Sequence, residues 1–83
     1  MKRVKVLYFA GVRDLTGRSD EELELPESVG NVSAFVSHLE RERPVLRGRL
    51  ESVRVAVNET FADATDPVRD NDVIALIPPV AGG

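Results

Sequence analysis

The sequence of 83 residues contains no cysteine, no tryptophan and a single histidine. Without cysteine, the chain has no disulfide, no thiolate metal site and no thiol nucleophile. The single histidine, His38, also excludes a zinc site built from several histidines. These absences remove most of the catalytic chemistry that a chain of this length could carry on its own side chains.

Excess positive charge and long apolar runs are absent too. The net charge is −3, which argues against nucleic acid as a partner because phosphate binding requires a basic surface. No apolar run approaches the ~20 residues that a membrane-spanning helix requires, so we expect no membrane partner. Residues 1–5 begin with basic residues but lack the apolar region and cleavage site of a signal peptide. We therefore expect a cytoplasmic protein.

The first third of the chain predicts two strands. Alternating apolar residues over residues 2–10 indicate the first strand. Residues 21–25 indicate a second, edge-like strand, whose glutamates keep other strand edges away. Between them, residues 11–17 are bracketed by glycines and predict a short helical turn.

One main helix follows. Asn31 is a suitable N-cap, and Pro44 stops the helix. Residues 40–43, a run of alternating charges, predict a solvated helix end. Residues 46–50 indicate a shorter helical turn that packs back. The buried face is an i, i+3, i+4, i+7 stripe made by Val32, Phe35, Val36 and Leu39.

The last third returns to strands, over residues 53–57, briefly over 60–62, and over 73–77. Asn71 lies in the turn before the last strand and can adopt a left-handed conformation. The order predicts an α+β fold of the β-grasp (ubiquitin-like) kind. Its mixed sheet has four to five strands, its main helix crosses one face, and its first and last strands are parallel neighbours. We expect one domain over residues 1–77.

Residues 78–83 form a tail of a different composition. No charged side chain occurs from residue 73 to residue 83, although 30% of the chain is charged. Pro78 and Pro79 end the strand and stiffen the start of the tail, whereas Gly82 and Gly83 make its end thin and conformationally free. Six extended residues reach at most about 20 Å. A terminal carboxylate on such a tail can enter a narrow pocket of another protein, whereas the alternative is an ordinary frayed end.

Three segments carry a resemblance to a known family. Residues 5–17 (KVLYFAGVRDLTG) are similar to the opening of molybdopterin synthase small subunits, and residues 55–59 (VAVNE) resemble their strand and turn. Residues 68–83 resemble their ending, in which the final Pro-Pro-Val-x-Gly-Gly is the most specific element. One departure is Asn71, where the family usually has glycine. Thiamine-pathway sulfur carriers also end in Gly-Gly, but typically without the double proline and in a shorter chain.

The resemblance implies a sulfur carrier that binds no cofactor itself. Gly83 would be adenylated by an E1-like adenylyltransferase, which uses ATP, because this chain has no Gly-rich phosphate loop. A sulfurtransferase or cysteine desulfurase would then supply persulfide sulfur and leave a thiocarboxylate on Gly83. The large subunit of molybdopterin synthase, in a heterotetramer of two small and two large subunits, would use it to convert cyclic pyranopterin monophosphate into the dithiolene of molybdopterin. Catalytic groups are expected on that subunit.

The resemblance also implies which residues meet these partners. Phe9, Phe61 and Ile77 match apolar contact positions of the family, and Arg13 matches a basic position that could pair with an acid. For the apolar residues the alternative is ordinary core packing, and for Arg13 it is a solvated charge. The tail residues that would enter the partner are Pro78, Pro79, Val80, Ala81, Gly82 and Gly83.

Three other functions stay open. The chain could carry sulfur for thiamine, for tRNA thiolation or for an amino acid. It could be a ubiquitin-like modifier joined to lysines of target proteins through Gly83. It could also be an interaction domain in which the glycines are inert.

Overall fold

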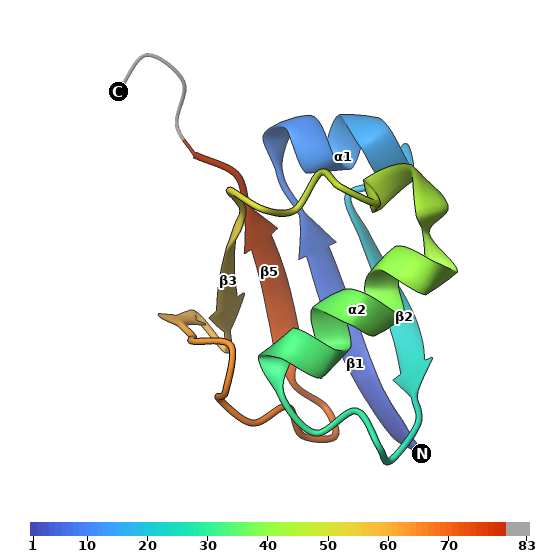
Figure 1. The fold of residues 1–83 in the computed structure, drawn as a ribbon, viewed down its shortest axis with the longest axis vertical. Helices are drawn as coiled ribbons and strands as arrows, with labels where there is room; N and C mark the ends of the chain where they lie inside the picture. Colours follow the sequence, from blue (N-terminus) through green and yellow to red (C-terminus); the bar gives the residue numbers. More distant parts are fainter. Residues whose placement is uncertain (80–83) are drawn as a thin grey trace.

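The computed structural model describes residues 1–79. The predicted flexible tail, residues 78–83, lies largely outside this range. Strands and helices alternate in the first half of the chain, and the last three elements are all strands (Figure 1). In chain order they are β1 (Lys2–Tyr8), α1 (Ala10–Thr16), β2 (Asp20–Leu25), α2 (Val32–Glu42), the 3₁₀ helix η1 (Pro44–Leu46), β3 (Arg54–Val57), β4 (Thr60–Phe61) and β5 (Val73–Ile77).

The strands form one five-stranded sheet in the order β2-β1-β5-β3-β4. β1 and β5 pair in parallel, and the other neighbours are antiparallel. Figure 1 shows α2 crossing one face of this sheet, with α1 at the end where β1 and β5 finish. The β-grasp prediction is therefore confirmed, including the parallel pairing of the first and last strands.

One apolar core fills the space between α2 and the sheet. Val4, Val6 and Tyr8 of β1 and Ile74 and Leu76 of β5 point into it and are buried. The predicted stripe of α2 faces the same core, although Val36 is only partly buried. This alternation leaves the odd-numbered residues of β1 and β5 on the opposite face of the sheet.

The ends of α2 follow the predicted signals. The Asn31 side chain accepts a hydrogen bond from the backbone N–H of Ala34 at 2.8 Å, which caps the N-terminus. The helix ends at Glu42, and Pro44 opens the 3₁₀ helix that buries Leu46. Asn71 is left-handed, with a φ of 70°, as its place in the turn predicted.

The first strand is shorter than predicted. It ends at Tyr8, and a helix of seven residues begins at Ala10, one residue before the short helical turn predicted over residues 11–17. The carbonyl of Phe9 accepts hydrogen bonds from the N–H groups of Val12 (3.1 Å) and Arg13 (3.4 Å). Gly17, left-handed at a φ of 76°, closes the helix. Phe9 thus stands at a corner between strand and helix rather than inside a strand.

Glu21 was predicted to be a solvated edge charge, and this prediction was wrong. Its side chain is 5% exposed and accepts hydrogen bonds from the Tyr8 hydroxyl and the Arg43 guanidinium. Arg18 lies 3.3 Å away. Burial alone would raise the pKa of Glu21, but hydrogen bonds from Arg43 and Tyr8 and the nearby positive charges outweigh it and lower that pKa. The charged end of α2, residues 40–43, is therefore tied to the sheet by Arg43.

Replacing Glu21 by glutamine is expected to lower the free energy of unfolding at neutral pH by about 2 kcal/mol. The Arg43 charge would lose its counter-ion, although its side chain is 31% exposed, which moderates the loss. Because the folded-state pKa of Glu21 is lowered, its stabilisation is present above pH 4.5, the group's ordinary pKa, and is lost as the pH falls below it. Urea unfolding at several pH values measures this difference. Glu22→Gln, on the exposed side of β2, is the control and should change stability by less than about 0.5 kcal/mol; equal losses in both variants would contradict the prediction.

Candidate functional site

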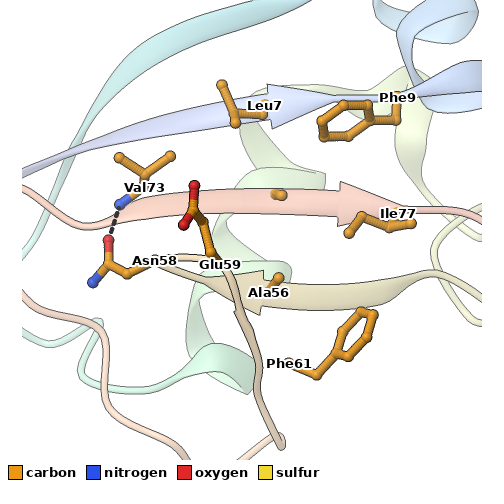
Figure 2. Close-up of a pocket in the computed structure, with 9 residues that line it drawn as sticks. Leu7, Phe9, Ala56, Asn58, Glu59, Phe61, Val73 and Ile77 are labelled. Carbon is orange, nitrogen blue, oxygen red and sulfur yellow. Dashed lines mark hydrogen bonds between the residues drawn. The ribbon is translucent and has the colours of Figure 1, made fainter.

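The face of the sheet opposite α2 carries a shallow apolar hollow. The pairing registers place Leu7 beside Ala75, Ala75 beside Ala56, and Ala56 beside Phe61. The hollow has a volume of about 530 Å³, and Figure 2 shows its side chains rising from strands on both sides of β5. The lining residues are Leu7, Phe9, Ala56, Asn58, Glu59, Phe61, Val73, Ala75 and Ile77.

Two aromatic side chains of this hollow are open to water. Phe9 is 45% exposed and Phe61 is 55% exposed. Core packing, the alternative for these residues, is therefore wrong for both. Ile77 is half-buried and lines the same hollow. Contiguous exposed apolar side chains mark interaction surfaces, so the three predicted contact residues lie together on a surface suited to docking.

Arg54 stabilises one side of the hollow. Its guanidinium carbon lies 4.0 Å from the centroid of the Phe61 ring, a cation–π arrangement that holds the ring on the sheet. Arg54 faces outward because it pairs with Ile77 in the register of β3 and β5. Arg54 was not among the predicted site residues, although its alternation with Val53 and Val55 could have placed it on the open face.

The opposite side is formed by the turn between β3 and β4. Val57 pairs with Thr60, so Asn58 and Glu59 make a two-residue turn, with φ values of 52° and 71°. This is the type I′ geometry, which favours asparagine and then glycine. A glutamate in the left-handed region costs about 1 kcal/mol. The resemblance of residues 55–59 predicted a turn here, but Glu59 was not among the predicted site residues although it lines the hollow.

The tail leaves the domain beside this face. β5 ends at Ile77, and Pro78 is half-buried and lines a small cavity together with Val12 and Leu15 of α1 and Val53. Pro79 is exposed. The other predicted tail residues, Val80, Ala81, Gly82 and Gly83, lie outside the described residues, so their roles stay predictions.

The predicted role of Arg13 also stays a prediction. Its side chain is exposed on α1, at the end of the sheet from which the tail leaves (Figure 1). Within residues 1–79 its guanidinium takes part in no hydrogen bond or salt bridge found in the structure. Such a cation is available to a partner.

The same part of the chain offers no cluster of metal ligands and no membrane-spanning helix. No group of three or more histidine, aspartate or glutamate side chains there could hold a metal ion. His38 is half-buried on α2, and its Nε2 atom has no hydrogen-bond partner among the described residues. None of the helices formed by residues 1–79 is both long and apolar enough to cross a membrane.

Several curated proteins that are similar to this chain carry the same name. A molybdopterin synthase sulfur carrier subunit from Mycobacterium tuberculosis is 40% identical over 86 residues, covering 100% of this chain and 100% of the relative. A solved structure of a candidate molybdopterin converting factor subunit 1 from Pyrococcus furiosus is 30% identical, with a TM-score of 0.85, covering 96% of this chain and 100% of that one.

Two further structures are similar in fold alone. One is a complex of subunits 1 and 2 of a molybdopterin-converting factor from Helicobacter pylori, with 24% identity, a TM-score of 0.69, and coverage of 98% and 99%. The other is SAMP1 from Haloferax volcanii, with 21% identity, a TM-score of 0.85, and coverage of 98% and 99%. The ThiS family matches residues 6–83, nearly the whole sequence. The chain therefore belongs to the ThiS family.

Proposed function

We propose that this protein is the sulfur carrier subunit of a molybdopterin synthase. The observation that carries this function is the exposed apolar hollow beside the root of the Pro-Pro tail, because it joins a docking surface to an extended reactive end. The M. tuberculosis relative, similar along both whole chains, supports this pathway over the others. The cytoplasm is the proposed compartment.

The chemistry proposed for Gly83 needs an activating partner. A carboxylate resists substitution because its leaving group would be oxide, so its oxygen first attacks the α-phosphate of ATP and pyrophosphate leaves. The terminal sulfur of a persulfide then displaces AMP from the acyl-adenylate. A second thiol of the sulfur donor then attacks the donor sulfur of this acyl disulfide. The S–S bond of the former persulfide breaks, which releases the thiocarboxylate and leaves a disulfide on the donor. An E1-like adenylyltransferase and a sulfurtransferase or cysteine desulfurase supply these groups.

The second proposed partner is the large subunit of the synthase. Its pocket receives the tail, and the thiocarboxylate sulfur forms a bond to a carbon of cyclic pyranopterin monophosphate as an oxygen substituent leaves that carbon. Water then hydrolyses the acyl group and regenerates the Gly83 carboxylate. Two carriers are needed for each dithiolene, which fits an assembly of two small and two large subunits. The large subunit supplies the acid and base groups.

A protein modifier is the main competing function. The fold does not separate the carrier from the modifier, since SAMP1, the small archaeal modifier protein 1 of Haloferax volcanii, has the same architecture. Both functions also need an adenylated C-terminal glycine. The double proline before the tail end and the relatives named for molybdopterin synthase favour the carrier.

Intact-mass measurement separates these functions. After incubation with the adenylyltransferase, ATP and a persulfide donor, the chain should gain about 16 Da, the difference between sulfur and oxygen. Omission of ATP is the control and should leave the mass unchanged. Covalent adducts to other proteins through Gly83, without the small mass gain, would favour the modifier and contradict the carrier.

A further inference from the structure

In the turn between β3 and β4, hydrogen bonds within the fold account for the presence of Asn58 but not for that of Glu59. The Asn58 carbonyl oxygen accepts a hydrogen bond from the Val73 N–H at 2.9 Å, and its amide donates to Asp72 at 2.9 Å. Asn58 therefore ties the turn to the start of β5. Glu59 holds the position at which a type I′ turn favours glycine, with its φ at 71°.

No interaction within the described domain compensates this strain. Glu59 forms no salt bridge or side-chain hydrogen bond found among residues 1–79. Arg54, a cation on the same sheet face, is engaged over the Phe61 ring. A strained residue whose side chain forms no hydrogen bond or ion pair with the rest of the described domain is the kind of outlier that points to a function.

The Glu59 side chain lies on the surface that a docking partner would cover. Glu59 lines the apolar hollow together with Leu7, Val73 and Ala75. Figure 2 shows its carboxylate reaching over β5 beside Val73, rather than away from the sheet. A partner that covers the exposed rings of Phe9 and Phe61 therefore also removes this carboxylate from water.

A carboxylate removed from water without a counter-ion strongly opposes binding. A protein that docks on this hollow must therefore place a cation beside Glu59. We propose that Glu59 is a specificity-determining residue of the docking face, which pairs with a lysine or arginine side chain of the large subunit. This inference rests on the proposed function and names the chemistry that its partner must present. Proteins that offer an apolar surface without that cation are rejected.

Two substitutions separate the charge of Glu59 from its backbone strain. Glu59→Gln keeps the side-chain shape and removes the charge, so the dissociation constant for the large subunit should rise about tenfold or more, with a weaker dependence on salt. Glu59→Gly relieves the strain, so the melting temperature should rise by about 4 °C while binding still weakens. Isothermal titration and thermal unfolding measure the two effects.

The controls distinguish failure of this inference from failure of the proposed function. Glu42→Gln, at the exposed end of α2 on the other side of the molecule, should leave affinity and its salt dependence unchanged. Wild-type affinity in Glu59→Gln, with binding weakened by Phe9→Glu, would overturn the role of Glu59 alone. Unchanged binding in both variants would overturn the docking face itself.

Discussion

Removal of Gly83 is expected to abolish sulfur transfer while leaving the domain folded. The tail residue that reacts must reach a site inside another protein, and one residue fewer withdraws the carboxylate by about 3.5 Å. Misplacement of a reacting group by only 1 Å can reduce a rate about 100-fold. Thiocarboxylate formation, followed by intact mass, should therefore fall at least about 100-fold, and so should molybdopterin synthesis with the large subunit.

Three comparisons make this result specific. Addition of one residue after Gly83 should be equally inactive, because it moves the carboxylate away from its predicted position. Ala81→Gly, which keeps the tail length and its last residue, should retain most of the loading. Thermal unfolding should be the same for all variants, since residues 1–79 are intact in each. Normal loading of the shortened chain would contradict the assignment of Gly83 as the reacting residue.

Placing a charge on the apolar hollow is expected to have the second largest effect. Phe9→Glu should raise the dissociation constant for the large subunit about 100-fold, because truncating a central aromatic contact typically costs 2 kcal/mol or more and the new charge adds a desolvation cost. The folded monomer should tolerate this change, since Phe9 is 45% exposed. Ile77→Glu should weaken binding in the same direction, with some loss of stability because Ile77 is half-buried.

Val45 provides the matched control for this experiment. It is an apolar residue that is 48% exposed, but it belongs to η1, outside the hollow. Val45→Glu should therefore leave the affinity unchanged in the same titration. Equal loss of binding in Val45→Glu and Phe9→Glu would show that the hollow is not the docking surface.

The architecture was predictable because its signals are local. Alternation within β1 and β5 separated the core face from the open face, and Asn31 and Pro44 marked the limits of α2. The end of β1 was placed two residues too late because Phe9 continues the strand pattern, whereas Ala10 adopts a φ of 49°. A left-handed alanine has no sequence signal, so the corner between strand and helix is visible only in three dimensions.

The charged contacts were not predictable for a different reason. Glu21 shares the buried face of β2 with Leu23 and Leu25, but a charge at such a position is stable only if partners reach it. Those partners, Tyr8 and Arg43, are 13 and 22 residues away in the sequence. The contacts within the site were not predictable either. Alternation placed Leu7 and Ile77 on the open face, but no local sequence signal connects Arg54 to Phe61 or Glu59 to β5.

The parallel pairing of β1 with β5 has a consequence for synthesis of the protein. β1 is made first, but its central neighbour comes from the other end of the sequence. The sheet therefore cannot form around β5 until that strand has left the ribosome, and such long-range contacts form slowly. A translation product that stops before β5 lacks the middle of its sheet and exposes its core to proteases. Only chains that include β5 can complete the sheet, so proteases are expected to remove products that end before the root of the tail.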